Sequence, residues 1–297
     1  MTAHPERIGF IGLGNMGRPM AGRLAAAGYQ VHGFDASPGV MRSLGGPGGL
    51  RPASSLAEAA EPGRVILMLP DSAVVERVLL GGDDSGALLG SLKPGSLVID
   101  MSSSDPLRTR ELAATLAGHD VTLIDAPVSG GVAGAVAGTL TIMVGGPEDE
   151  VAAIRPVLET MGSRVVRAGD TGAGHAVKAL NNLMSAAHLL ASSEALIAGR
   201  RFGLDPAVML EIINGSSGRS GSTELKWPRY VLTGSYDAGF AARLMVKDIR
   251  LALAIEHATG TPSAVSEATV AAWSAALDEL GPDADHTAIV RWVERES

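Results

Sequence analysis

The residues with the clearest chemical potential near the start of the chain form a glycine-rich turn made of Gly12, Leu13, Gly14, Asn15, Met16 and Gly17. A strand-like apolar run over 8–11 precedes this turn, and a helical pattern over 18–27 follows it. In this context the first glycine permits a tight turn, the second lets a pyrophosphate approach the backbone, and the third lets the helix pack closely against the strand. Because the N–H groups at a helix start attract phosphate, the turn predicts a dinucleotide-binding site.

An acidic residue follows the next predicted strand. That strand covers 30–34 and leads to Asp35, about 20 residues beyond the turn, where dinucleotide-binding folds place a ribose-binding carboxylate. Asp35 is therefore predicted to accept hydrogen bonds from the ribose hydroxyls of NAD and to repel the 2′-phosphate of NADP. His32 and Arg42 lie nearby in the sequence and weaken the exclusion of NADP, and a purely structural role for Asp35 as a cap or loop carboxylate stays open.

A second glycine-rich segment follows a predicted strand over 121–125. Ser129, Gly130 and Gly131 would expose one hydroxyl and successive backbone N–H groups, which is a suitable arrangement for binding a carboxylate. An ordinary turn between two strands is the alternative.

A lysine and an asparagine share one face of a predicted long helix over 173–200. Lys178 and Asn182 stand four residues apart, and Ser185 lies one further turn along. Burial would lower the pKa of Lys178 toward neutrality, so that it could donate and remove a proton, while Asn182 orients a hydroxyl or carboxylate. A solvated helix lysine is the alternative. His175, three residues before Lys178, is expected to pack at the helix N-terminus or to face solvent.

The pattern of the whole chain predicts the elements that position these residues. Short β-branched runs alternate with helical stretches up to about residue 166, with strands expected at 8–11, 30–34, 65–68, 97–100, 121–125, 139–144 and 164–167. Helical patterns then take over, at 173–200, 206–214, 241–259, 262–280 and 286–294. The predicted fold is α/β: a Rossmann-type dinucleotide-binding domain over 1–166, then a connecting helix and an all-α C-terminal domain over 167–297, with a mostly parallel doubly wound sheet.

Composition excludes several classes of partner. The 297 residues carry a net charge of −8, which argues against binding a nucleic-acid backbone. There is no cysteine, hence neither a disulfide nor a thiolate metal site, and the histidines lack metal-ligand spacing, so no metal is expected. The longest uncharged stretch is interrupted by glycines, and the first residues lack the zones of a secretory signal. We therefore expect no membrane partner and a cytoplasmic location.

Four segments, taken in order, resemble the β-hydroxyacid dehydrogenase family over nearly the whole chain: residues 9–21, 125–139, 172–182 and 239–252. The resemblance implies that Lys178 is the general acid or base, that Ser129, Gly130 and Gly131 hold the substrate carboxylate, and that Asn182 orients the substrate. This match favours the functional interpretation of Lys178 over that of a solvated lysine.

The same resemblance extends the expected cofactor site. It places the Leu69 and Pro70 turn near the ribose and nicotinamide, and Ser103 on the nicotinamide side, although the run of three serines leaves that register open by one. It brings Lys247 to the nicotinamide end of the cofactor or to the substrate, with Asp248 supporting the lysine.

The expected activity is NAD-dependent hydride transfer between a nicotinamide and a small 3-hydroxy acid similar to 3-hydroxyisobutyrate, giving the semialdehyde. Two alternatives stay open: an NADPH-dependent reductase of a small aldehyde acid such as glyoxylate, succinic or tartronate semialdehyde, and a dinucleotide-binding protein without turnover. The apolar faces of the Ala- and Leu-rich helices predict a homodimer or homotetramer. Arg219, in a polar loop over 216–220, is expected either to contact a second substrate carboxylate or to be an ordinary exposed arginine.

Overall fold

The computed structural model describes residues 6–44, 50–82 and 87–295. Tertiary contacts divide the chain into two compact units, Met1–Lys178 and Ala179–Ser297. The division expected from the sequence, after residue 166, falls inside the last strand of the first unit, Arg164–Gly169, and stays a prediction.

Within its described residues, the first unit contains a nine-stranded sheet. Its strands are β1 (Arg7–Ile11), β2 (Gln30–Phe34), β3 (Leu50–Pro52), β4 (Arg64–Leu67), β5 (Ser96–Asp100), β6 (Val121–Asp125), β7 (Val128–Ser129), β8 (Thr141–Gly145) and β9 (Arg164–Gly169). Their order is β3-β2-β1-β4-β5-β6-β8-β7, with β9 paired to β8. The first six strands pair in parallel, and β8 runs antiparallel to β6 and β7. The strand order reverses between β1 and β4, which is where open α/β sheets bind ligands.

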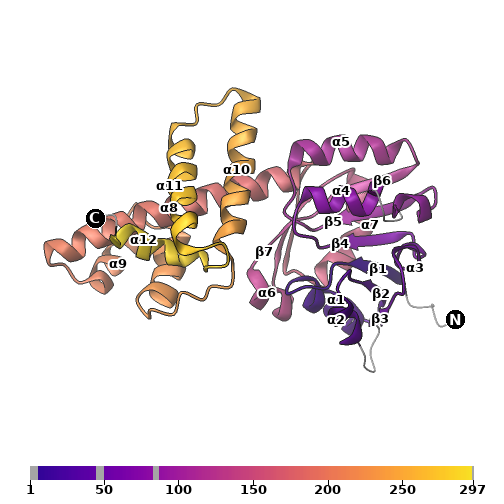
Figure 1. Ribbon diagram of the computed structural model, residues 1–297, viewed down its shortest axis with the longest axis horizontal. Helices are drawn as coiled ribbons and strands as arrows, with labels where there is room; N and C mark the ends of the chain where they lie inside the picture. The colour runs from indigo at the N-terminus through magenta and orange to yellow at the C-terminus, as the bar shows by residue number, and fades with distance from the viewer. Residues whose placement is uncertain (1–5, 45–49, 83–86, 296–297) are drawn as a thin grey trace. The chain divides into compact units, whose positions relative to one another are not determined.

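Helices pack against both faces of this sheet, as Figure 1 shows. They are α1 (Gly17–Ala26), α2 (Pro38–Arg42), α3 (Leu56–Ala60), α4 (Ser72–Leu80), α5 (Pro106–Ala117), α6 (Gly131–Ala137) and α7 (Glu148–Glu159), with a short 3₁₀ turn at Leu89–Ser91. Successive β4 side chains point to opposite faces: Ile66 belongs to the core that includes Leu24 of α1, and Leu67 to the core that includes Leu79 of α4. The two separate cores confirm the predicted doubly wound Rossmann-type architecture.

The seven predicted strands are all present, with ends shifted by no more than a few residues. Strands β3 and β7 were not predicted, because with three and two residues they are too short to show a period. Helix α6 was not predicted either, because its sequence Gly-Val-Ala-Gly-Ala-Val-Ala contains two glycines and suggests a loop.

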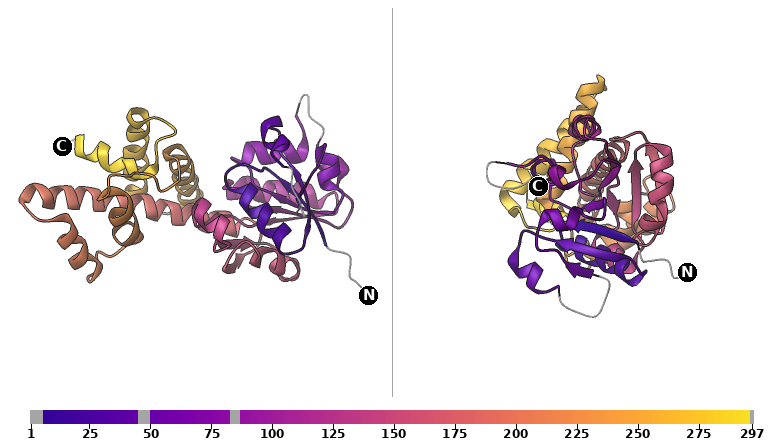
Figure 2. Two further views of the ribbon diagram at one scale, coloured as in Figure 1. Left: turned by 90° about the horizontal axis from the view of Figure 1, so that it is seen from below. Right: turned by 90° about the vertical axis from the view of Figure 1, so that its right-hand side faces the viewer.

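The second unit is helical, as expected. Helix α8 (Ala173–Phe202) begins in the first unit and continues through this one, followed by α9 (Pro206–Asn214), a π-helix η2 (Ser222–Val231), α10 (Ala242–Thr259), α11 (Ala264–Leu280), a 3₁₀ turn η3 (His286–Ala288) and α12 (Ile289–Arg295). Figures 1 and 2 show α10 and α11 running side by side. Trp273 of α11 is fully buried beside α8 and donates its indole N–H to the Ala186 carbonyl at 3.3 Å.

The π-helix is the main element of this unit that the sequence did not reveal. Pro228 lies inside it, and a Gly- and Ser-rich stretch precedes it, so the local signals indicate a loop. Within the described ranges, no helix is both long and apolar enough to cross a membrane.

Candidate functional site

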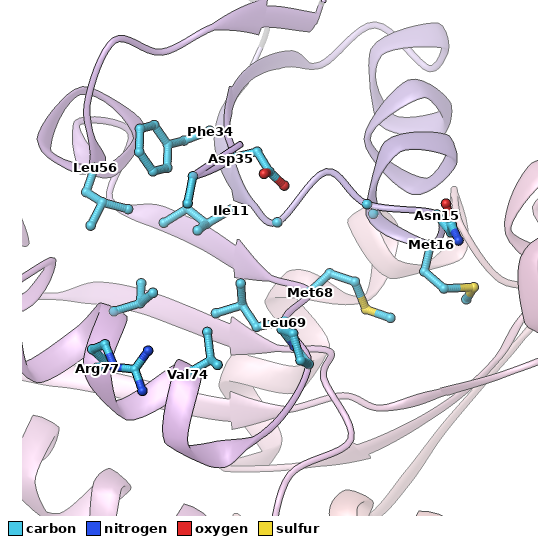
Figure 3. Close-up of a pocket in the computed structure, with 16 residues that line it drawn as sticks. Ile11, Asn15, Met16, Phe34, Asp35, Leu56, Met68, Leu69, Val74 and Arg77 are labelled. Carbon is cyan, nitrogen blue, oxygen red and sulfur yellow. The ribbon is translucent and has the colours of Figure 1, made fainter. Parts of the chain in front are cut away.

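A cavity of about 660 Å³ lies at the carboxyl ends of β1, β2 and β4. Eight of the residues predicted to bind the cofactor line it: Gly12, Gly14, Asn15, Met16, Gly17, Asp35, Leu69 and Pro70. Figure 3 shows Asp35 and Asn15 on the glycine-turn side of this cavity and Met68 and Leu69 on the opposite side. The cavity therefore forms where the strand order reverses between β1 and β4.

The glycines of the turn meet the requirements of a dinucleotide. Gly12 has a φ of 93° and its Cα faces the Met68 carbonyl, and a Cβ at Gly17 would overlap the Gly12 carbonyl oxygen. At Gly14, by contrast, a Cβ would meet nothing within 4 Å. No atom of the described residues therefore explains glycine there, whereas a pyrophosphate close to the backbone would. No side chain caps the start of α1, so its first N–H groups suit a phosphate.

Asp35 fixes the turn as well as facing the cavity. Its Oδ2 accepts a hydrogen bond from the Leu13 backbone N–H at 2.8 Å, and its Oδ1 accepts one from Ser37 at the same distance. The Leu13 side chain is 1% exposed and belongs to the core, so only the backbone of this predicted cofactor residue is near the site. Each Asp35 oxygen retains a lone pair for a ribose hydroxyl.

The cavity has further walls that the sequence analysis did not identify. Phe34, Leu56 and Val74 supply apolar surface, and Arg77 lies beside them, as Figure 3 shows. No single sequence motif indicates these four residues, because they come from a strand end and two separate helices. His32 and Arg42, which weakened the predicted exclusion of NADP, are not among the residues that line this cavity.

The strand ends after β4 and β5 are connected by serine hydroxyls. Ser102 Oγ accepts a hydrogen bond from the Leu69 backbone N–H at 2.9 Å, which fixes the turn that carries Leu69 and Pro70. Ser104 Oγ donates to Asp100 Oδ2 at 2.8 Å. Ser103, the predicted nicotinamide-side residue, is half-buried between them and does not line the cavity. In the triplet, therefore, Ser102 and Ser104 both form internal structural hydrogen bonds.

A buried carboxylate anchors the beginning of α8. Asp125, at the end of β6, accepts hydrogen bonds from the backbone N–H groups of Gly172 at 2.6 Å and His175 at 2.8 Å. Burial raises the pKa of Asp125, and the nearby His175 and these two N–H groups oppose that rise. A Cβ at Gly174 would overlap the Met143 carbonyl oxygen and crowd Asp125, so glycine is required for this close approach. The anchor fixes the turn of α8 that leads to Lys178.

His175 is a packing residue, and the alternative in which it faces solvent is wrong. Its side chain is completely buried. Nδ1 lies 2.9 Å from Thr109 Oγ1, and Nε2 lies 3.1 Å from the Ser102 carbonyl oxygen. The ring therefore links α8 to α5 and to the strand end after β5.

Lys178 is 9% exposed, and Asn182, one turn further along α8, is 6% exposed. Asn182 Nδ2 donates to Asp248 Oδ2 at 2.6 Å, and Asp248 Oδ1 lies 3.3 Å from Lys247 Nζ. Asp248 therefore holds both Asn182 and Lys247, residues that lie more than 60 positions apart. In the sequence, the only sign of these contacts is that Lys247 and Asp248 are adjacent.

The remaining predicted substrate residues lie in two places. Ser129 ends β7 and is half-buried, and Gly130 and Gly131 follow with φ angles of 133° and 61°. Such angles favour glycine. Arg219 forms an ion pair with Glu224 at 2.8 Å, and its side chain is 61% exposed. This contact favours the interpretation of Arg219 as a surface residue.

Comparisons with known proteins cover both units. A family profile described as "NAD binding domain of 6-phosphogluconate dehydrogenase" matches residues 7–169, and one described as "NAD-binding of NADP-dependent 3-hydroxyisobutyrate dehydrogenase" matches residues 172–293. The chain is 44% identical to a 3-hydroxyisobutyrate dehydrogenase of Pseudomonas aeruginosa, over 83% of this chain and 84% of the relative. It is 41% identical to a 2-(hydroxymethyl)glutarate dehydrogenase of Eubacterium barkeri, over 83% and 81%. A solved 3-hydroxyisobutyrate dehydrogenase of Mycobacterium tuberculosis with L-serine matches with a TM-score of 0.87 and 33% identity, over 97% of this chain and 99% of that one.

Proposed function

Because the chain belongs to the β-hydroxyacid dehydrogenase family and uses a nicotinamide cofactor, we propose that it is an NAD-dependent dehydrogenase that oxidises a small 3-hydroxy acid to the semialdehyde. The observation that carries this proposal is a buried lysine, Lys178, on a helix whose start is fixed by Asp125. Two named relatives act on acids with a hydroxymethyl group beside a carboxylate, which supports a 3-hydroxy acid with a substituent on carbon 2.

Lys178 is proposed to move the proton. The nicotinamide, when bound, supplies the carbon that accepts the hydride. As the C–H bond of the carbinol breaks, the neutral amine of Lys178 takes the hydroxyl proton, and in the reverse direction the ammonium returns it. The position of Lys178 supports this role, because it is buried on α8 one turn before Asn182, the residue proposed to orient the substrate.

Asn182 and the Ser129 loop are proposed to orient the substrate. Because Asp248 accepts one hydrogen from Asn182 Nδ2, the amide group is held in one orientation, and its second N–H is directed by that bond. The Ser129 hydroxyl and the N–H groups of Gly130 and Gly131 are proposed to bind the carboxylate. Lys247, held by Asp248, is proposed to contact the nicotinamide end of the cofactor.

Changing Asp35 to Asn should reduce the preference for NAD over NADP. The substitution keeps the shape of the side chain but removes the negative charge that would repel a 2′-phosphate. We expect the ratio of kcat/KM with NAD to that with NADP to fall by about tenfold or more, since tenfold corresponds to about 1.4 kcal/mol. Steady-state kinetics with both cofactors measures the ratio. Equal values of kcat/KM with NAD and NADP in the unmodified protein would rule out the proposed role of Asp35 in excluding NADP.

A panel of 3-hydroxy acids and aldehyde acids tests the activity itself. We expect NAD reduction with 3-hydroxypropanoates that carry a small substituent on carbon 2. Turnover only in the reductive direction with NADPH would instead identify a reductase of a small aldehyde acid. Absence of any turnover, with tight NAD binding by calorimetry, would indicate a binding protein without catalysis.

A further inference from the structure

A second shielded lysine lies in the helical unit, outside the residues considered so far. Lys226 is part of the π-helix η2, and its Nζ donates a hydrogen bond to Ser185 Oγ of α8 at 2.7 Å. Burial lowers the pKa of Lys226 to about 8, so the ammonium form still predominates at pH 7. Among the described residues, no carboxylate forms an ion pair with it. A shielded charge with one hydroxyl partner is energetically unfavourable unless an anion completes its surroundings.

The nearest acidic group already has other partners. Asp285 attracts Lys226 electrostatically, but its Oδ2 accepts the backbone N–H of Gly239 at 2.7 Å, and its Oδ1 accepts that of Thr287 at 2.9 Å. Burial, and then the charge of Lys226, lower the pKa of the neighbouring His286 to about 4, so this imidazole is neutral at pH 7. Asp285 therefore favours the ammonium without forming an ion pair with it, and the neutral His286 adds no negative charge.

Among the described residues, the Ser185 hydroxyl that binds Lys226 and the Ser222 hydroxyl about one turn away also lack acceptors. Ser185 Oγ accepts from Lys226, and within the described part of the chain its own hydrogen has no acceptor. Ser222 lies four residues before Lys226, about one turn earlier in the π-helix, and is 2% exposed. Its hydroxyl has no partner among the described residues. An ammonium and two hydroxyls that can donate together suit an anion with several oxygen atoms.

This cluster lies along the same face of α8 as the proposed catalytic residues. Ser185 is three residues beyond Asn182, about one turn of α8. It is seven residues beyond Lys178, about two turns of the same continuous helix. At 1.5 Å per residue, the axial separation between Lys178 and Ser185 is about 10 Å. A substrate with a few carbons between its functional groups matches this separation along the helix.

We infer that Lys226, with Ser185 and Ser222, binds a second carboxylate of the substrate, several carbons from the carbon that carries the hydroxyl. This inference rests on the proposed function and narrows it to 3-hydroxy acids with two carboxylates. Lys226 fits this role better than Arg219, because Arg219 is exposed and already pairs with Glu224.

A matched pair of substrates tests the inference. Both are 3-hydroxypropanoates, and they differ only on carbon 2, where one carries a methyl group and the other a carboxyethyl group. For the unmodified protein we expect kcat/KM to be at least tenfold higher with the dicarboxylate. In Lys226→Met the ratio of the two kcat/KM values should fall by about 10- to 100-fold, mainly through KM, and in Ser185→Ala by a smaller factor. Arg229→Met, which removes an exposed charge from the same π-helix, is the matched control and should leave the ratio unchanged.

Binding of glutarate and butyrate to the NAD-loaded protein separates this inference from the proposed function. By calorimetry, glutarate should bind at least tenfold more tightly than butyrate, and Lys226→Met should remove the difference. If glutarate has this advantage but neither hydroxy acid is oxidised, the proposed function fails and the Lys226 site stands. Equal affinities for the two acids in the unmodified protein, or an advantage for glutarate that persists in both Lys226→Met and Ser185→Ala, would overturn the inference.

Discussion

Replacing Lys178 with alanine is expected to lower kcat by about 10²- to 10⁴-fold, the usual contribution of a positioned acid or base. The reason is that, in the part of the chain that the structure describes, no other lysine is both buried and on the first turns of α8. The affinity for NAD should be retained, because the cavity at the glycine turn does not include this residue. Stopped-flow and steady-state measurements of reduced nicotinamide formation give kcat directly.

The control for Lys178→Ala is Lys93→Ala, which removes an exposed lysine from the first unit. The control should retain full activity. In the Lys178 variant, the limb of the pH–rate profile that reports the base should also disappear. Turnover at the unmodified rate in Lys178→Ala would exclude the lysine from the proton transfer.

Replacing Asp125 with alanine is expected to destabilise the protein by about 3–5 kcal/mol. The substitution leaves the N–H groups of Gly172 and His175 without their acceptor inside the core, and each unsatisfied buried group costs about 1–3 kcal/mol. Urea unfolding monitored by circular dichroism measures the loss. Because Asp125 fixes the start of α8, kcat should fall as well, even where the variant remains folded.

Asp149→Ala is the matched control, since Asp149 is an exposed carboxylate on α7 of the same unit. It should change stability far less than Asp125→Ala. A free energy of unfolding for Asp125→Ala equal to that of the control would show that α8 does not depend on this anchor.

Much of the fold was predictable because it is encoded by short-range patterns. The apolar runs of β1, β2 and β6 each match the length of one strand, and the turn at 12–17 has glycines at the positions that the local backbone requires. The cofactor cavity could likewise be placed from one segment, since Asp35 follows the next strand directly. The helices of the second unit were also predictable, because the spacing of apolar residues within each segment indicates a helix.

The parts that were not predictable depend on contacts between distant residues. Asp125 meets the start of α8 about 50 positions later, and Asp248 meets Asn182 after 66 positions, so no spacing within one segment reveals either contact. The contact between Lys226 and Ser185 is equally hidden, because these residues are 41 positions apart. In addition, the π-helix that carries Lys226 contains a proline, which suggests a loop. The sequence left His175 open between packing and solvent exposure for the same reason, because its partners Thr109 and Ser102 lie in other elements.

The most direct test of the central claim follows the hydride itself. The unmodified protein is incubated with NAD and a 3-hydroxypropanoate that carries deuterium on the hydroxyl-bearing carbon and a substituent on carbon 2, and the reduced nicotinamide is examined by NMR. We expect deuterium at C4 of the nicotinamide ring, together with formation of the semialdehyde. Binding of NAD without any deuterium at C4, with either the methyl- or the carboxyethyl-substituted acid, would contradict this claim.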